Sequence, residues 1–272
     1  MNATLQATAQ PHIVHVHIHG FYAAVEQSLR PRLRGKPVVV GGNTVISASY
    51  EAAASGITAG MAVERALALC PAANVVPARH ERYVEYTERL RAVLKSFTPA
   101  VDPDSRNGFY LNFFGSSHLQ GDDFAGTLRR LQLEILKLTG LSVSIGAAKS
   151  KIAAAVASRL QSPGGTRAVA CGTEAAYLAS LPVEALNGLH SIDGKELRIR
   201  GIQTIGELRR VPLAALELAF GKPLARQIWH HSRGLDARPK TKPLASFPAS
   251  ALPTLSGLPR LFREFATAFL SI

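Results

Sequence analysis

The order of strand and helix patterns between residues 13 and 147 limits the fold of this chain more than any other feature. A strand pattern at 13–19 is followed, after an intervening segment, by a long amphipathic helix and two strand patterns. A second amphipathic helix and a strand pattern at 141–147 come next. This order is β-α-β-β-α-β, the split βαβ or ferredoxin-like arrangement. The sequence therefore predicts an α+β fold.

Both long helices are predicted from apolar residues that recur at helical spacing, and Gly140 follows the expected end of the second. The strands between the helices are expected at about 99–103 and 109–114. The residues expected to face the core are Val84, Leu90, Val93, Leu94 and Phe97 in the first helix, and Phe124, Leu128, Leu131, Ile135 and Leu138 in the second.

Four segments lie outside this order. Residues 21–82 are predicted to form a small domain inserted after the first strand, with a helix at 21–29, a strand pair at 37–42 and 44–49, and short helices at 50–55 and 61–69. Residues 174–234 are predicted to form short helices separated by glycines. The tail at 1–10 is expected to be disordered, and the segment after Arg238, rich in Pro, Ser and Lys, is expected to be a linker.

The composition narrows the class of protein. The chain has 31 Lys and Arg against 19 Asp and Glu, a net charge of +12, which fits either a solvated surface or a polyanionic partner such as nucleic acid. Two isolated cysteines suggest a reducing compartment. No signal peptide and no apolar run of roughly 18 residues is present. We therefore expect a cytoplasmic protein that does not enter a membrane.

The stretch HVHIHGFYAAVEQ, residues 15–27, contains an unusual strand-to-helix corner. His15, His17 and His19 alternate, so they share one face of a strand. Alternate strand residues can bind one transition-metal ion, but no Cys, Asp or Glu nearby completes such a set. The prediction is that these histidines bind no metal.

Six stretches together resemble the Y-family translesion DNA polymerases, of the UmuC and DNA polymerase IV type, from about residue 12 to 250. They are HVHIHGFYAAVEQ, LRGKPVVVGG, VISASYEAAASGITAGMAVERALALCP, FTPAVDPDSRNGFYLN, LSVSIGAAKSKIAAAVASRLQSPGG and LPVEALNGLHSIDGKELRIRGIQTIGEL. The resemblance implies a palm at 11–20 and 83–170, fingers at 21–82, a small all-helical thumb at 171–236, and at 237–272 a linker with the truncated start of a little finger.

Polymerases of this family resemble other two-metal phosphoryl-transfer enzymes, in which carboxylates hold two Mg²⁺ ions. The resemblance places His17 and His19 at the two positions of the family's Asp-x-Asp, and Asn107 and Gly108 at those of its Asp-Glu. Every expected metal carboxylate is therefore replaced. Asp104 is expected to face the other way and Asp102 to lie beyond the hairpin, so neither is expected to take over.

The resemblance assigns other positions to substrate contacts. Tyr22 matches the steric gate, Ser47 and Tyr50 match residues that hydrogen-bond the triphosphate, and Lys151 matches the lysine that neutralises it. The fingers arginine is replaced by Ala53, and the thumb's Gly-x-Gly has become Gly188-Leu189-His190. The residues expected to contact the DNA backbone are Lys149, Lys195, Arg198 and Arg200.

The missing acids favour a catalytically silent member that binds primer–template DNA and needs no cofactor. It resembles the ImuB class, accessory proteins that work beside a replicative-type polymerase and other repair proteins. One alternative is an active translesion polymerase with unusual metal use, such as Mn²⁺ held by His17 and backbone oxygens; Mg²⁺ is the cofactor expected of an active member. Two others are a protein-interaction scaffold that no longer binds DNA and a decayed gene product without function.

Overall fold

The computed structural model describes residues 11–104, 108–114, 124–186 and 191–236. Its main sheet has the strand order β5-β6-β1-β7-β8. Strand β1 pairs antiparallel with both β6 and β7, and the fifth strand, β8, is parallel to β7. The strands are β1 Ile13–His17, β5 Val101–Asp104, β6 Gly108–Asn112, β7 Ser144–Ala148 and β8 Thr166–Ala168.

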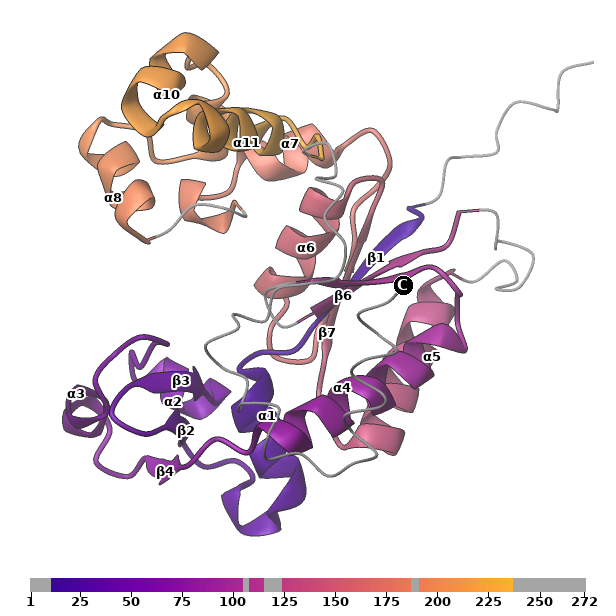
Figure 1. Ribbon diagram of the computed structural model, residues 1–272. Coiled ribbons are helices and arrows are strands. Elements are labelled where there is room, and N and C mark those ends of the chain that lie inside the picture. The colour runs from indigo at the N-terminus through magenta and orange to yellow at the C-terminus, as the bar shows by residue number, and fades with distance from the viewer. Residues whose placement is uncertain (1–10, 105–107, 115–123, 187–190, 237–272) are drawn as a thin grey trace, which may run out of the picture. The chain divides into compact units, whose positions relative to one another are not determined.

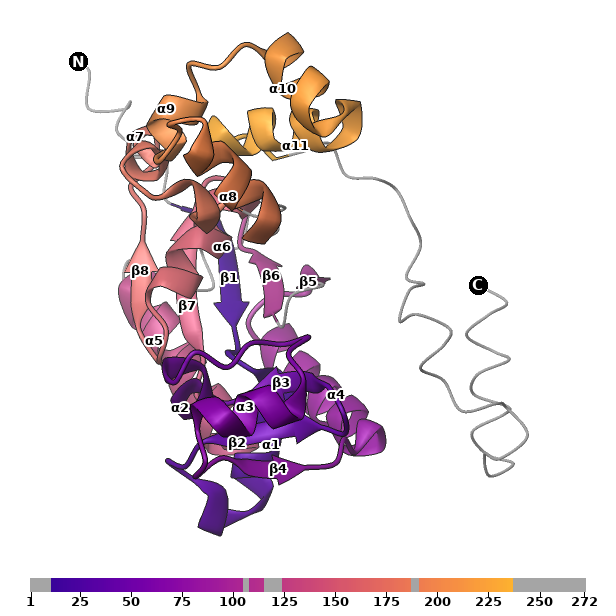
Figure 2. The same cartoon turned by 90° about the vertical axis from the view of Figure 1, so that its left-hand side faces the viewer.

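Helices cover both faces of this sheet (Figures 1 and 2). Helices α4 (His80–Lys95) and α5 (Phe124–Thr139) lie on one face, and α6 (Lys151–Leu160) lies on the other. The first four strands and the two helices α4 and α5 follow one another as βαββαβ. The predicted α+β class is confirmed.

The alternation of β1 divides its side chains between the two faces. Val14 and Val16 are fully buried in the core that α4 and α5 form with the sheet. His15 points to the other face, where it contacts Ser158 of α6. Successive strand residues point to opposite faces, so His17 shares the α6 face with His15.

A second, three-stranded sheet is formed by residues between β1 and α4. Its strand order is β3-β2-β4, with β2 antiparallel to β3 and parallel to β4. Its elements are α1 Phe21–Leu29, the 3-10 helix η1 Pro31–Leu33, β2 Val38–Gly41, β3 Val45–Ala48, α2 Tyr50–Ala54, α3 Val63–Leu69 and β4 Asn74–Val76. The predicted strand pair and short helices of this segment are present.

Short helices follow β8, and their apolar residues join those of α6 in one core. They are α7 Glu174–Ala179, the 3-10 helix η3 Val183–Ala185, α8 Ser191–Ile199, α9 Ile205–Leu208, α10 Leu213–Phe220 and α11 Lys222–Ser232. Among the residues described, no helix combines the length and apolar character that crossing a membrane requires. The boundaries of palm, fingers and thumb remain predictions.

Two residues predicted to face the core are exposed. Val84 is 57% exposed, and the buried residues of α4 near it are Tyr83 and Tyr86. Leu138 is 56% exposed, and Thr139 is buried in its place. Both errors arise because a count of aliphatic residues omits aromatic and hydroxyl side chains, which pack in the core when their polar atoms find partners.

Candidate functional site

Aromatic rings form a continuous row along the α6 face of β1. The ring of Tyr110 lies 4.6 Å from that of His15, between ring centroids. The ring of His17 lies 6.2 Å from His15 and 6.4 Å from His19. The row ends at Tyr50, 5.4 Å beyond His19. The structure therefore brings the three histidines together with one of the residues predicted to contact a nucleotide.

His15 is held at both ring nitrogens. Its Nδ1 lies 2.6 Å from Ser158 Oγ, and its Nε2 lies 3.0 Å from Asp104 Oδ2. Burial lowers the pKa of His15 although Asp104 raises it. The tautomer of the His15 ring decides which atom donates in these two contacts, and the Ser158 hydroxyl also donates to the Ala155 carbonyl at 2.9 Å. The connectivity is that of a nucleophilic triad, but His15 and Ser158 are fully buried, so no substrate reaches the hydroxyl.

His17 has a different environment from its neighbour. It is 9% exposed, and its Nδ1 is buried without a hydrogen-bond partner within the described ranges. Burial, followed by the charges of His15 and Arg159, lowers the pKa of His17 to about 3. The pKa of His19 is also lowered by burial. Near neutral pH this face therefore carries neutral imidazoles where the resemblance expects carboxylates.

Gly108 lies opposite His17 in the register of β1 and β6. A Cβ atom at Gly108 would stand 2.5 Å from the Val16 carbonyl oxygen and 2.7 Å from His15 Nε2. The carbonyl belongs to a central strand and the ring of His15 is held at both nitrogens, so neither moves easily. The His15 ring and the missing side chain at Gly108 are therefore coupled. Asn107, the other replaced position of this pair, lies outside the described residues.

The prediction that Asp104 faces away from this site is wrong. Asp104 pairs with Gly108, which in turn pairs with His17, and partners across antiparallel strands share a face. The prediction counted strand positions from Asn107, and an odd separation placed Asp104 on the face opposite to Asn107. The relevant neighbour is Gly108, which lies opposite Asp104. Asp104 is engaged with His15, and Asp102, opposite Tyr110, forms an ion pair of 2.9 Å with Lys151 Nζ.

These residues do not fit a pair of Mg²⁺ ions. Mg²⁺ requires oxygen ligands in octahedral geometry, whereas the described replaced positions offer two imidazoles and a glycine. The charge of Arg159 acts on both His15 and His17, and a cation there repels a metal ion. Within the described ranges, no three histidine, cysteine or carboxylate side chains form a group that could hold a metal.

The residues predicted to bind a nucleotide all contact other parts of the chain. Tyr22 stacks on Tyr83, with ring centroids 4.2 Å apart and planes 11° from parallel. The buried Ser47 hydroxyl accepts from the Ala23 backbone N–H at 3.4 Å, so it fixes the start of α1. Tyr50 is 43% exposed, and its hydroxyl donates to the Ser162 carbonyl at 3.4 Å.

Lys151, at the start of α6, lies among carboxylates. Besides the ion pair with Asp102, its Nζ stands 5.1 Å from the centre of the Tyr110 ring. The two carboxylate oxygens of Asp236 accept from the backbone N–H groups of Lys151 and Ile152, each at 3.0 Å. The donors that a phosphate would use at this helix start are thus already bound by the chain itself.

The residues predicted to contact DNA are exposed but partly paired. Arg198 forms an ion pair with Glu184, and Arg200 lies 2.7 Å from Glu196. The Lys149 side chain is exposed, and its backbone N–H donates to Glu174 at 3.2 Å. The side chain of Lys195, and residues 188–190 with His190, lie outside what the structure describes.

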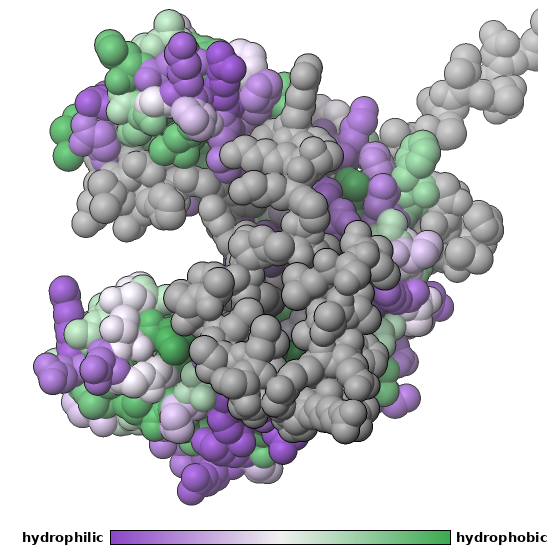
Figure 3. Space-filling view, viewed as in Figure 1, coloured by the Kyte–Doolittle hydropathy of each residue, from purple (hydrophilic) through white to green (hydrophobic). Residues whose placement is uncertain are grey.

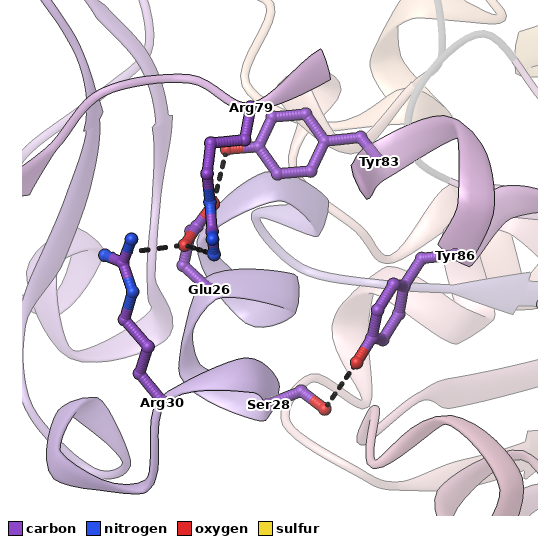
Figure 4. A network of polar contacts seen from close by, with 6 residues as sticks. All are labelled: Glu26, Ser28, Arg30, Arg79, Tyr83 and Tyr86. Carbon is purple, nitrogen blue, oxygen red and sulfur yellow. Dashed lines mark hydrogen bonds and ion pairs between the residues drawn. The ribbon is translucent and has the colours of Figure 1, made fainter. Parts of the chain in front are cut away.

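Sequence reasoning missed the cluster that supports Tyr22 (Figure 4). Glu26 of α1 is fully buried and accepts from Arg79 at 2.5 and 3.0 Å and from the Tyr83 hydroxyl at 2.9 Å. Burial is the main cause that raises the pKa of Tyr83 to about 12. Arg30 adds an ion pair at 3.6 Å. An acid beside the buried Val25 was the one sequence signal for this cluster.

Comparisons with known proteins identify the family of this chain. Residues 16–159 match the model of the impB/mucB/samB family. DNA polymerase IV of Dehalococcoides mccartyi (strain CBDB1) is 35% identical over 238 residues, 85% of this chain and 60% of that protein. DNA polymerase IV 2 of Mesorhizobium japonicum is 39% identical over 83% of this chain and 55% of its own length.

Solved structures also match more than four fifths of this chain. A ternary complex of Dbh has a TM-score of 0.72 and 27% identity, covering 84% of this chain and 68% of that one. The crystal structure of DinB from Sulfolobus solfataricus also has a TM-score of 0.72 and 27% identity, covering 81% and 66%. The chain spans about three fifths of the length of the DNA polymerase IV relatives it matches. The chain belongs to the impB/mucB/samB family, that is, to the Y-family of translesion DNA polymerases and their homologues.

Proposed function

We propose that this chain is a non-catalytic member of the family that holds primer–template DNA during damage tolerance and does not extend it. The observation that carries the proposal is the histidine face: His17, His19 and Gly108 occupy positions where the family resemblance expects carboxylates. The lowered pKa values of His17 and His19 leave both rings neutral near pH 7.

Coulomb's law gives the scale of the attraction for a metal ion that is lost when a carboxylate is replaced by a neutral imidazole. Two unit charges about 4 Å apart interact by roughly 4 kcal/mol at an effective dielectric constant of 20. A neutral imidazole in place of a carboxylate forfeits that attraction for each metal ion it faces. Neutral imidazole also binds Zn²⁺, Cu²⁺ or Ni²⁺ better than Mg²⁺. Asp104, the carboxylate nearest to the face, is engaged with His15.

Binding of DNA without chemistry is supported by what the chain retains. The net charge is +12, and Lys149, Arg198 and Arg200 are exposed. Contacts of this kind go to phosphates, so the affinity is expected to fall with salt and to depend little on base sequence. Its partners are proposed to be the primer–template and, as in the ImuB class, a replicative-type polymerase that performs the synthesis.

Primer extension tests the proposal. With purified chain, a labelled primer–template and all four deoxynucleotides, we expect no product in Mg²⁺ or in Mn²⁺, while the same duplex is shifted in a gel at low salt. An active family member serves as the positive control. Incorporation above background that His17→Ala abolishes would overturn the proposal.

One observation favours a second candidate, a polymerase with unusual metal use. The buried Nδ1 of His17 has no partner within the described ranges, and a neutral ring nitrogen is a metal ligand. This candidate requires Mn²⁺-dependent extension that is lost in His17→Ala. A scaffold that no longer binds DNA would instead show no salt-sensitive shift of the duplex at any protein concentration.

A further inference from the structure

A turn with four basic residues follows helix α1. Arg30, Arg32, Arg34 and Lys36 lie within residues 30–36, called the basic turn below, and this segment contains no acidic residue. Helix α1 has nine residues and is therefore about 13 Å long. The basic turn follows its C-terminal end, whereas His19 and Tyr22 are at its N-terminal end. The basic turn is thus separate from the histidine face.

The backbone of the basic turn is fixed by the rest of the molecule. Leu33, 4% exposed, anchors it in the core, and the Leu33 N–H donates to the Arg30 carbonyl at 2.8 Å. The side-chain amide of Gln27 donates to the carbonyls of Leu33 and Lys36 at 3.3 and 3.0 Å. A turn held in this way keeps its backbone in one arrangement, so little backbone entropy is lost when its side chains bind a ligand.

Two of the described carboxylates lie near the basic turn and do not balance its four cations: Glu26, and Glu51, which accepts from the Gln27 side-chain amide at 3.0 Å. Arg30 and Arg79 share one carboxylate, that of Glu26, at 3.6 and 2.5 Å. The Arg34 guanidinium donates to the Ser28 carbonyl at 3.3 Å. This contact lies near the last turn of α1, where a cation interacts favourably with the negative end of the helix dipole. Among the described residues, the side chains of Arg32 and Lys36 form no ion pair or hydrogen bond, so stabilisation of α1 does not explain them.

The basic residues of α4 provide the contrast. Arg82 and Arg89 both form ion pairs with Glu85, at 3.0 and 2.5 Å, so each has a carboxylate partner. Arg32 and Arg34, by comparison, are exposed, and Figure 3 shows hydrophilic residues gathered at the lower end of the molecule, where the turn lies. The basic turn therefore has two cations without an ion-pair partner among the described residues, Arg32 and Lys36, whereas Arg82 and Arg89 are paired.

We infer that the basic turn is a second contact for the phosphate backbone of DNA, apart from the thumb and palm residues proposed above. Several cations on a fixed turn suit a ligand with closely repeated negative charges, and each phosphate they neutralise releases bound counterions. The inference rests on the proposed DNA binding and extends it to a surface at the far end of α1.

Fluorescence anisotropy with three labelled probes tests the inference. The probes are a primer–template with a single-stranded overhang, a blunt duplex and a single strand, each titrated at several salt concentrations. The variant is Arg32→Ala/Lys36→Ala, which removes the two unpaired cations. The matched control is Arg82→Ala/Arg89→Ala, which removes the same charge from paired positions. Thermal unfolding confirms that both variants are folded.

We expect the basic-turn variant to lose roughly tenfold in affinity at about 50 mM salt, and its slope of log K against log salt to fall by about 2. For the control variant, the decrease in log K at the same salt concentration is expected to be less than half of the decrease for the basic-turn variant. The probe with the largest loss identifies the form of DNA that reaches the turn. Equal losses in both variants would show an effect of net charge alone and overturn the inference. If the unmodified chain binds none of the probes, the proposed function fails as well.

Discussion

Two buried polar groups near the N-terminus, Glu26 and His17, illustrate opposite outcomes of burial. Glu26 is fully buried, and its carboxylate accepts from Arg79 and from Tyr83 (Figure 4). His17 is 9% exposed, yet its Nδ1 has no partner within the described ranges. A buried polar atom without a partner costs about 1–3 kcal/mol, whereas a satisfied network fixes the elements that form it.

The contrast between Glu26 and His17 shows which buried polar groups have partners in the surrounding structure. The Glu26 cluster joins α1 to α4 and supports the ring of Tyr22, so every member has a structural task. His15 is also accommodated, by Ser158, Asp104 and the missing side chain at Gly108. His17 stands at a position that the resemblance assigns to a metal ligand, and no described residue forms a hydrogen bond with its Nδ1.

The largest expected effect comes from removing the satisfied carboxylate. Glu26→Ala leaves the buried Tyr83 hydroxyl without its acceptor and the Arg79 guanidinium without its partner. We expect a loss of about 3 kcal/mol in the free energy of unfolding, less than for a fully buried pair because Arg79 can turn to solvent. Urea denaturation measures it. Glu85→Ala removes an exposed carboxylate that also binds two arginines and should cost far less, because solvent screens exposed ion pairs. Equal losses would refute the comparison.

The next effect concerns the accommodated histidine. Gly108→Ala places a Cβ against the Val16 carbonyl and the His15 ring, and overpacking of this kind costs about 2 kcal/mol. In His15→Ala/Gly108→Ala the clash with the His15 ring is absent. The double variant should therefore lose less unfolding free energy than His15→Ala and Gly108→Ala lose together. Gly42→Ala, where a Cβ meets nothing within 4 Å, is the control. Strict additivity would show that the two positions are not coupled.

The same geometry decides what restoring the acids would do. In His17→Asp/His19→Asp/Asn107→Asp/Gly108→Glu, the glutamate enters space held by His15, so we expect no primer extension and a less stable fold. Extension by this variant would show that the His15 ring yields readily, and would contradict the coupling.

The stability of the chain is also expected to depend on pH. The folded-state pKa of His17 is about 3, below its ordinary value of 6.5. Below pH 6.5 the unfolded chain therefore binds a proton that the folded chain refuses, and stability falls as the pH falls from 6.5 toward 3. At pH 5 the loss attributable to His17 is about 2 kcal/mol relative to pH 7.5. His15 and His19 act in the same direction. Urea denaturation at both pH values measures the loss, and equal stability would contradict the burial of these rings.

The sequence allowed the βαββαβ order and the replaced acids to be predicted, because amphipathic spacing and residue identity are both local. It did not reveal the place of Asp104, because the face a strand residue occupies depends on which residue lies opposite it, and the hairpin fixes that register. Nor did it reveal the Glu26 cluster, whose partners are 53 and 57 residues away. Strands β4 and β8, three residues each, are too short to form a pattern.

The smallest effect is the most direct test of His17. In His17→Leu an apolar side chain of similar size replaces the ring, which removes both the unpartnered Nδ1 and the titrating group. We expect a gain of about 1 kcal/mol at pH 7.5, because the cost of the unsatisfied nitrogen exceeds the lost contacts with His15 and His19. The loss of stability between pH 7.5 and pH 5 should shrink by about 2 kcal/mol. If His17→Leu were instead destabilised like Glu26→Ala, His17 would have a structural partner, and the contrast between the two buried groups would disappear.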